Sequence, residues 1–223
     1  MADQPGIYVS VCLRLWVRTC LVSICLLLNV HLHAAEALDP ALIARLATTM
    51  AEDQSMDNPY DAEVWFRASD QRLSRFVKTP EERLSILQTV YTQAYRNQLD
   101  PDLILSVMHV ESAFDHFAIS KVGAQGLMQV MPFWRLEIGR PQDILTEIET
   151  NILYGTTILA HYLEVSKGDL VQALGRYNGS RGRLKYPEKV VSKYRKTWQN
   201  KNMHELPQLQ KTCELYRLNA CYL

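Results

Sequence analysis

One segment decides the fold: DPDLILSVMHVESAFDHFAISKVGAQGLMQVMP, from Asp100 to Pro132. Its first half predicts a helix, because Asp100 can accept from the free amides of a helix start and Pro101 suits the first helical position. Apolar side chains recur there at helical spacing in two adjoining rows: Leu103, Val107, Val110 and Phe114, then Ile104 and Met108. Glu111 continues the second row about three turns into the helix, so we expect it to border the buried face.

Glu111 is the candidate catalytic residue. A carboxyl group that loses hydration favours its neutral form, and the raised pKa suits a general acid at neutral pH. By periodicity alone, a hydrated glutamate at the rim of the helix is the commoner arrangement. The residues that follow change this interpretation.

The second half of the segment combines glycines with polar side chains. Gly123 and Gly126 allow positive φ or close backbone approach, and we expect a short helix at 127–131 that Pro132 interrupts. Ser120 and Gln129 supply polar groups that can orient Glu111. Each also has an ordinary explanation: Ser120 as a turn hydroxyl and Gln129 as a surface amide.

Four ordered blocks in this region carry a resemblance to a known family. The chain resembles the soluble-type (family 1) lytic murein transglycosylases, whose lysozyme-like domain carries E-S-x-F, A-x-S, G-A-x-G-L-M-Q-x-M-P and A-x-x-x-Y-N. The matching residues are Glu111, Ser112, Phe114; Ala118, Ser120; Gly123, Ala124, Gly126, Leu127, Met128, Gln129, Met131, Pro132; and Ala173, Tyr177, Asn178. The resemblance spans about 80–198. It departs after Asn178, where the chain reads Gly-Ser, and at Phe133-Trp134, where many relatives have Pro-x-Thr.

The resemblance implies cleavage of the peptidoglycan β-1,4 bond between N-acetylmuramic acid and N-acetylglucosamine, leaving a 1,6-anhydromuramoyl end. Glu111 would act first as acid and then as base, with substrate assistance in place of a second carboxylate. By resemblance, the Tyr177 hydroxyl would bond the catalytic carboxyl and Asn178 would shape the site. Ser120, Gln129 and Met131 would contact the sugars, and no cofactor is implied.

Two alternatives stay open at this point. A lysozyme-like hydrolase would need a carboxylate opposite Glu111, and Asp115 is the nearest candidate in sequence, although it is expected to end the helix or face solvent. A non-catalytic scaffold that binds peptidoglycan in the envelope would use the same groove without cleavage.

Helical patterns follow one another along nearly the whole chain. We expect helices at 39–51, 61–77, 79–97, 100–114, 151–166, 169–177 and 187–201, with a capping box at Thr79. No convincing alternating strand and no internal repeat is found. The predicted fold is all-α: a lysozyme-like helical domain with a substrate groove, preceded by a small helical extension. The predicted division is a signal peptide at 1–35, the extension at 36–79, the catalytic domain at 80–200 and a tail at 201–223.

The beginning of the chain resembles an export signal. Arg14 and Arg18 precede an apolar stretch at 19–30, which small residues follow. This stretch is short for a bilayer span, which takes about 20 residues. We therefore predict a periplasmic protein exported by a cleaved signal, with an uncleaved membrane anchor as the alternative.

The cysteines, the histidines and the net charge bear on whether the protein holds a disulfide, binds a metal or binds nucleic acid. Outside the signal the cysteines are Cys213 and Cys221, which would pair in an oxidising compartment, or stay free in a frayed tail. The histidines lack metal-ligand spacing, so no metal is expected. The formal net charge is zero, which argues against a nucleic-acid binder despite a basic run at 181–196. Peptidoglycan glycan strands are the expected partner, with envelope assembly machinery as a further one, and we expect a monomer.

Overall fold

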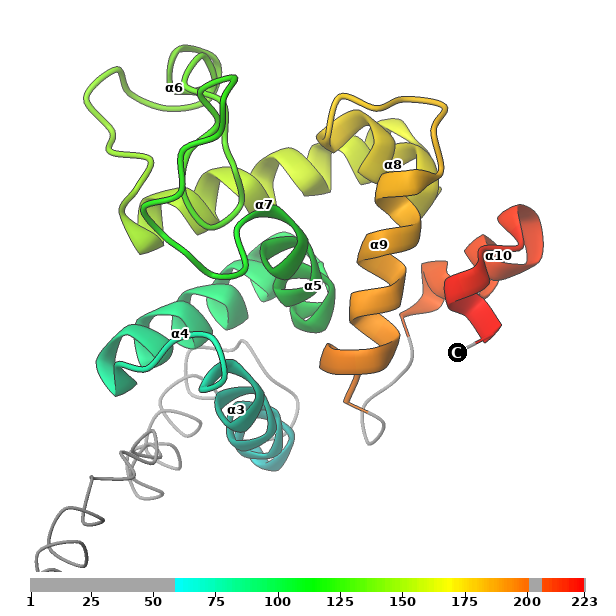
Figure 1. The fold of residues 1–223 in the computed structure, drawn as a ribbon, viewed down its shortest axis with the longest axis horizontal. Coiled ribbons are helices and arrows are strands. Elements are labelled where there is room, and N and C mark those ends of the chain that lie inside the picture. Colours follow the sequence, from blue (N-terminus) through cyan, green and yellow to red (C-terminus); the bar gives the residue numbers. More distant parts are fainter. Residues whose placement is uncertain (1–58, 201–205, 223) are drawn as a thin grey trace, which may run out of the picture. The chain divides into compact units, whose positions relative to one another are not determined.

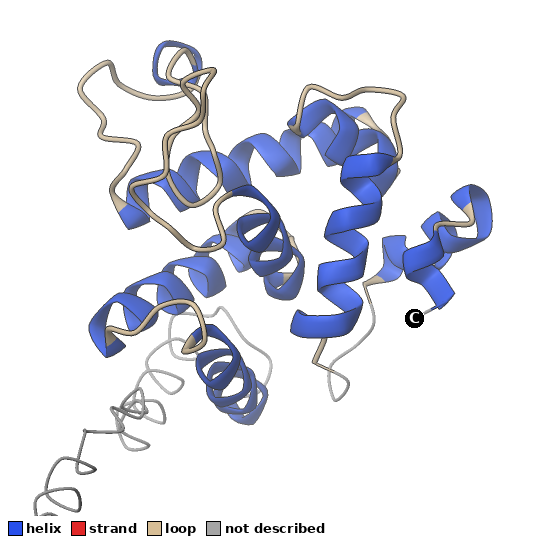
Figure 2. Ribbon diagram, in the orientation of Figure 1, coloured by secondary structure: helices blue, strands red, loops and turns tan. Residues whose placement is uncertain are grey.

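The computed structural model describes residues 59–200 and 206–222, which belong to the unit formed by residues 35–223. Helices and connecting loops make up this part of the chain (Figures 1 and 2). The elements are α3 (Pro59–Leu73), α4 (Pro80–Arg96), α5 (Pro101–Glu111), α6 (Trp134–Glu137), α7 (Ile148–Val165), α8 (Leu170–Tyr177), α9 (Lys185–Lys193), the π-helix η2 (Tyr194–Trp198), α10 (Pro207–Tyr216) and the 3₁₀-helix η3 (Asn219–Tyr222). No strand occurs in the described residues, so the all-α prediction is confirmed for them.

The predicted helix starts are present, but one of them is capped differently. Asp100 Oδ1 accepts from the backbone amides of Asp102 at 2.7 Å and Leu103 at 3.2 Å, as the sequence predicts. Thr79 precedes α4 as expected but makes no side-chain cap hydrogen bond, so the capping-box prediction is wrong. The start of α4 is instead favoured by Pro80 at the first helical position and by Glu81 and Glu82, which complement the helix dipole.

Helix α5 lies at the centre of the described helices (Figure 1). It packs against α4, α9 and η2, while α7 packs against α4 and α8. The predicted apolar rows are buried: Leu103, Ile104, Val107 and Met108 are at most 1% exposed. Most side chains of α5 are therefore in the core. Glu111 is the last residue of the helix and is only partly buried.

Helix α3 falls within the predicted extension but shares the core of the following helices. Trp65 and Phe66 are fully buried, and the Trp65 indole Nε1 donates to Asp102 Oδ1 of α5 at 2.7 Å. A residue from the extension therefore meets the helix that carries Glu111. The domain bounds themselves remain predictions.

The segment after α5 differs from the expectation. Residues 127–131 do not form the predicted short helix; they belong to a turn between Gln125 and Val130, whose amides and carbonyls exchange two hydrogen bonds of 2.9 Å. Gln129 has φ +48°, a left-handed conformation that a continuing helix does not allow. The turn belongs to the loop segment that joins α5 to α6 (Figure 1).

The predicted tail contains two further helical elements. Helix α10 packs on α8, and η3 packs on α9. Cys213 and Cys221 are joined by a disulfide with their Cα atoms 5.6 Å apart. The disulfide thus closes a short loop that contacts two helices of the preceding domain.

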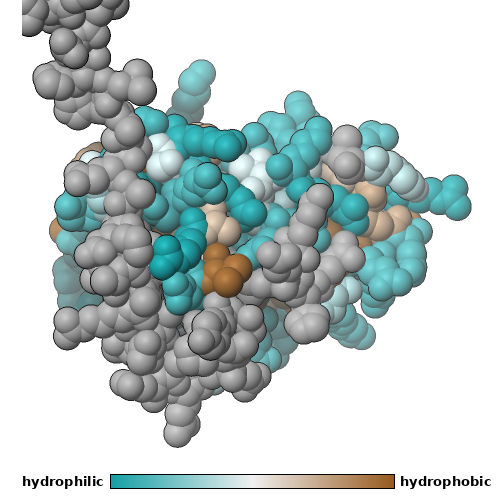
Figure 3. Space-filling view, turned by 90° about the horizontal axis from the view of Figure 1, so that it is seen from below, coloured by the Kyte–Doolittle hydropathy of each residue, from teal (hydrophilic) through white to brown (hydrophobic). Residues whose placement is uncertain are grey.

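Other predictions concern residues outside the described part. The signal at 1–35 and the helix at 39–51 both lie there. No helix within 59–200 and 206–222 combines the length and the apolar character that a membrane crossing requires. On the face drawn in Figure 3, the described side chains are mostly hydrophilic around a small apolar patch.

Candidate active site

Glu111 is the last residue of α5, and the backbone reverses directly after it. Ser112 Oγ donates to the Leu127 carbonyl at 2.8 Å, which ties the helix end to the Gln125–Val130 turn. Ala113 and Phe114 then adopt φ +51° and +70°. Two consecutive left-handed residues end the helix, because they point the chain away from its axis.

A cluster of aromatic rings holds this reversal. Phe114 is buried, and its ring centroid lies 5.1 Å from that of Trp198 and 5.3 Å from that of Phe76. The Trp198 indole donates to His109 Nδ1 at 3.1 Å. Burial, followed by the charge of Lys193, lowers the pKa of His109 to about 4, so this imidazole is neutral at pH 7 and accepts that bond.

The Glu111 carboxyl group is partly buried and hydrogen-bonded. Tyr186 of α9 donates its hydroxyl to Glu111 Oε1 at 2.6 Å. Burial raises the pKa of Glu111 above its usual value, against hydrogen bonds from Tyr186 and Asn178 and the charge of Lys189, which all lower it. Burial also raises the pKa of Tyr186, so its hydroxyl stays protonated and remains a donor. The arrangement therefore holds a proton on Glu111 to higher pH than in water.

Glu111 opens into a cavity of about 270 Å³ between α5 and the start of α9. Its lining residues are Val110, Glu111, Asn178, Ser180, Arg183, Lys185, Tyr186 and Lys189. Among them Glu111 is the only carboxylate, facing one guanidinium and two ammonium groups. Within the described residues, no cluster of three or more histidine, cysteine or acidic side chains is placed to hold a metal ion.

Asp115 does not oppose Glu111 in this cavity. It is exposed, and its Oδ1 accepts from the backbone amide of Phe117 at 2.9 Å. This hydrogen bond forms a local turn of the kind that aspartate favours after a helix. Asp115 therefore faces solvent, as expected, and holds a local turn.

Tyr177 is near Glu111 but bonds a different group. Its hydroxyl donates to the Met128 carbonyl at 2.7 Å, whereas the hydroxyl that reaches Glu111 belongs to Tyr186. Burial is the main cause that raises the pKa of Tyr177, and the charge of Glu111 adds to it. The expected hydrogen bond from Tyr177 to the carboxyl is therefore replaced by one that fixes the turn after Gly126.

The side chains of Ser120 and Gln129 also hold this turn. Ser120 Oγ accepts from the Ala124 amide at 3.0 Å, and Gln129 Nε2 donates to the carbonyls of Ala118 at 3.2 Å and Gly126 at 3.1 Å. Met131 is partly buried. None of these three residues lines the cavity at Glu111, while Asn178 does.

Two residues with clear roles were not anticipated. Tyr186 and Val190 lie on the buried face of α9, which Tyr194 of η2 continues, so the burial of Tyr186 was predictable but its partner was not. Asn151 is 1% exposed; its Nδ2 donates to the carbonyls of Gln125 at 2.8 Å and Leu145 at 2.6 Å, and its Oδ1 accepts from the Met128 amide at 2.7 Å.

Gly126 shows why the turn and Asn151 depend on each other. Its φ is +74°, and a Cβ built on it would collide with the Asn151 side chain and the Leu145 carbonyl. Only glycine therefore fits beside this amide. The geometry of the turn therefore depends on the absence of a side chain at Gly126 and on the buried Asn151 amide of α7.

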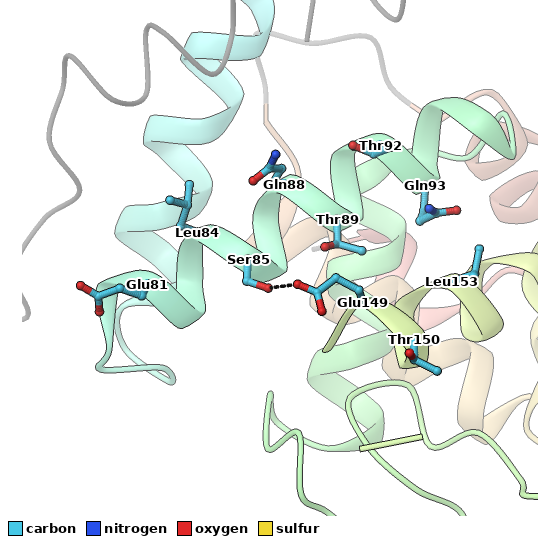
Figure 4. Close-up of a pocket in the computed structure, with 10 residues that line it drawn as sticks. All are labelled: Glu81, Leu84, Ser85, Gln88, Thr89, Thr92, Gln93, Glu149, Thr150 and Leu153. Atoms are coloured by element: carbon cyan, nitrogen blue, oxygen red, sulfur yellow. Dashed lines mark hydrogen bonds between the residues drawn. The ribbon is translucent and has the colours of Figure 1, made fainter. Parts of the chain in front are cut away.

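A second hollow of about 540 Å³ lies between α4 and α7 (Figure 4). Threonine, serine and glutamine side chains dominate its lining, and Ser85 Oγ donates to Glu149 Oε1 at 2.9 Å. None of the predicted site residues lines it. The chemistry expected from the sequence thus belongs to the cavity at Glu111.

Residues 88–200 match the sequence profile described as the transglycosylase SLT domain, which covers half of the chain and includes α5, the turn and α9. The chain belongs to the transglycosylase SLT domain family. This confirms the family predicted from the four sequence blocks.

Two curated relatives of this SLT domain align over 46 and 116 residues. Membrane-bound lytic murein transglycosylase C of Actinobacillus pleuropneumoniae is 50% identical over 46 residues, which cover 21% of this chain and 13% of the relative. A transglycosylase of Enterobacteria phage PRD1 is 30% identical over 116 residues, covering 52% of this chain and 43% of the relative. The chain therefore spans less than half the length of these curated relatives.

One solved structure that matches this chain is an inactive mutant of the lytic transglycosylase Slt from Pseudomonas aeruginosa. It is 20% identical with a TM-score of 0.40, and the match covers 68% of this chain and 31% of that one.

Proposed function

We propose that this SLT domain is a lytic transglycosylase that cleaves the β-1,4 bond between N-acetylmuramic acid and N-acetylglucosamine in peptidoglycan. The observation that carries the proposal is one partly buried, proton-holding carboxyl group, Glu111, in a cavity whose other charged side chains are cations. Protonated Glu111 donates to the glycosidic oxygen as the bond to the muramoyl anomeric carbon breaks. The acetamido carbonyl of the same sugar attacks that carbon and stabilises it.

The second step uses the same carboxyl group. Ionised Glu111 removes the proton of the C6 hydroxyl of the muramoyl sugar, and the C6 oxygen displaces the acetamido oxygen from the anomeric carbon. The product is a 1,6-anhydromuramoyl end, and Glu111 recovers its proton. No water is consumed.

The cavity favours this route over hydrolysis. Hydrolysing glycosidases usually carry a second carboxylate about 5 Å away in retaining enzymes or about 6.5–9.5 Å away in inverting ones. The other charged residues of the lining are Arg183, Lys185 and Lys189, and Asp115 is engaged in its own turn. Substrate assistance removes the need for that second carboxylate.

The remaining predicted site residues have positioning roles in this proposal. Asn178 and Tyr186 orient the carboxyl group, and Ser120, Gln129 and Tyr177 keep the turn beside it in shape. Met131 contributes apolar surface to the sugar groove next to that turn. We infer no cofactor.

The test is digestion of purified sacculi by the full chain in water enriched in oxygen-18, followed by mass spectrometry. The proposal predicts anhydro ends without the label. Labelled reducing ends would instead identify a hydrolase, and wall binding without any product would identify a scaffold. Glu111→Gln should abolish cleavage, while Glu164→Gln on the exposed surface of α7 serves as the matched control.

We also infer where the domain acts. Peptidoglycan lies outside the cytoplasmic membrane, so the activity requires export, for which the predicted signal at 1–35 would serve. The name of one relative includes membrane binding, which agrees with an envelope location. A monomer that meets envelope assembly machinery remains our prediction, testable by size-exclusion chromatography and by crosslinking in cells.

A further inference from the structure

A further cavity, of about 670 Å³, adjoins the one at Glu111 and differs from the hollow between α4 and α7. Lys189 and Val110 line both this adjoining cavity and the cavity at Glu111, so the two meet at the last turn of α5. The adjoining cavity is lined by His109, Val110, Ala113, Glu188, Lys189, Ser192, Lys193, Lys196 and Asn219. Its volume is in the range of sites that bind small molecules or peptides, roughly 300–1,000 Å³.

The cavity is electrostatically positive. Three lysines, Lys189, Lys193 and Lys196, face one glutamate, and the His109 imidazole is neutral at pH 7. Glu188 is already engaged, because its Oε1 accepts from the Ala220 amide at 2.7 Å. Within the described part of the chain, no hydrogen bond or ion pair engages the three ammonium groups.

Cations left without partners in a concave space indicate an anionic ligand. The glycan itself offers mainly hydroxyl and acetamido groups. In peptidoglycan the negative charges next to the cleaved bond are the carboxylates of the stem peptide, which is attached to the lactyl group of the muramoyl sugar. The adjoining cavity shares Val110 and Lys189 with the cavity at Glu111, so it lies beside the site where that sugar would bind.

We propose that the row Lys189, Lys193 and Lys196 binds the carboxylates of the stem peptide, so that the domain prefers peptide-bearing glycan over bare glycan. This inference rests on the proposed function, because it places the muramoyl sugar at Glu111. It extends that function by naming the substituted strand as the substrate.

Other anionic partners fit the cavity less well. Val110 and Ala113 are its only apolar lining residues, whereas surfaces that bind lipid headgroups usually insert larger apolar or aromatic side chains. The lining holds no phenyl, phenol or indole ring that could stack on nucleic-acid bases, and the His109 ring already packs against Phe76 and Trp198. A flexible peptide with several carboxylates needs neither feature.

The experiment compares cleavage of intact glycan strands with cleavage of strands from which an amidase has removed the peptides. The readout is the ratio of kcat/KM for peptide-bearing over peptide-free strands. In Lys193→Gln/Lys196→Gln this ratio should fall about fivefold, since each exposed ion pair contributes modestly. Lys211→Gln on α10, a lysine outside both cavities, should leave the ratio of the wild type unchanged.

Salt gives an independent check of the same ratio. The wild-type preference should decline as ionic strength rises, because screening weakens exposed charge pairs. An equal loss on both kinds of strand in the double variant would overturn the proposal. So would a double variant that keeps its strand ratio but loses binding to vesicles containing phosphatidylglycerol.

A binding measurement separates this inference from the proposed function. Calorimetry with Glu111→Gln compares a disaccharide-tetrapeptide with the same disaccharide lacking the peptide. If the wild type cleaves neither kind of strand, the catalytic proposal is rejected. If the peptide-bearing ligand nevertheless binds more tightly, and this difference depends on Lys193 and Lys196, the present proposal is supported. Equal binding of the two ligands would overturn it.

Discussion

The Tyr186 hydroxyl lies 2.6 Å from Glu111 Oε1, although the two residues are 75 positions apart in the sequence. This contact joins the end of α5 to the first turn of α9. It lowers the pKa of Glu111, against the larger effect of burial, which raises it. The protonation of the catalytic carboxyl group is therefore a property of how these two helices pack.

Tyr186→Phe should move the alkaline limb of the pH–rate profile to higher pH. Glu111 must be protonated to donate to the glycosidic oxygen, so activity declines as pH rises through its pKa. Removing a hydrogen bond that stabilises the ionised form raises that pKa further. We also expect kcat to drop about tenfold, because the carboxyl loses an orienting contact. A limb that moves to lower pH would contradict this assignment.

Tyr177→Phe is the matched comparison. Its hydroxyl bonds the Met128 carbonyl, so the variant should lose about 1 kcal/mol of unfolding free energy while the alkaline limb keeps its position. Urea unfolding and the pH–rate profile measure the two effects separately. A shift of the limb as large as that of Tyr186→Phe would show that Tyr177 acts on the carboxyl directly.

Asn151→Leu should unfold the turn at Gln125–Val130. The substitution leaves the carbonyls of Gln125 and Leu145 and the Met128 amide without their buried partner. We expect a loss of about 3 kcal/mol in chemical denaturation, together with most of the activity. Thr157→Val, on the same helix, removes only the hydrogen bond of a partly buried hydroxyl to the Leu153 carbonyl and should cost less than about 1 kcal/mol. Equal stability of the two variants would refute this role.

Asp102 predicts a pH dependence of stability. Burial, and then the neighbouring Asp100, raises the pKa of Asp102 from 3.8 to about 7 in the folded state. A raised carboxyl pKa means that the folded protein holds the proton more tightly, so stability declines as pH rises from the unfolded pKa to the folded one. Between about pH 5 and about pH 8 the unfolding free energy should fall by about 3 kcal/mol.

The control for this prediction is Asp102→Asn, which has no titrating group and should show a flatter profile. Trp65 and Asn200 donate to the two carboxyl oxygens, so the amide loses one of these bonds and starts from a lower stability. The slope with pH, rather than the absolute stability, is the quantity to compare. An unchanged slope would contradict the assignment to Asp102.

The sequence predicted well what depends on local spacing. Asp100 caps α5 as expected, and the apolar rows that Leu103 and Met108 represent are buried. Glu111 therefore reaches the edge of the packed region, as periodicity required. These features arise within one helix, where 3.6 residues per turn fix which side chains share a face.

Contacts between segments far apart in the sequence could not be predicted in this way. The turn is closed by two hydrogen bonds between Gln125 and Val130 and is held by the Asn151 side chain. Gln129 takes φ +48° within this turn, so the expected helix at 127–131 does not form. Tyr186 and Tyr177 lie on neighbouring elements and both approach Glu111. Which of them donates to the carboxyl depends on the docking of α9, and spacing in the sequence holds no information about that.

The backbone reversal at Ala113 and Phe114 has a consequence for engineering. Alanine is the strongest helix former, yet Ala113 sits in a left-handed conformation. Mutations that lengthen α5 would strengthen the helical preference of this segment. They would thereby oppose the packing of Phe114 against Phe76 and Trp198, which requires the reversal. A longer α5 would remove the reversal that places Glu111 at the end of the helix. Thermostability designs for this region should therefore keep Ala113 and Phe114 in their left-handed conformation.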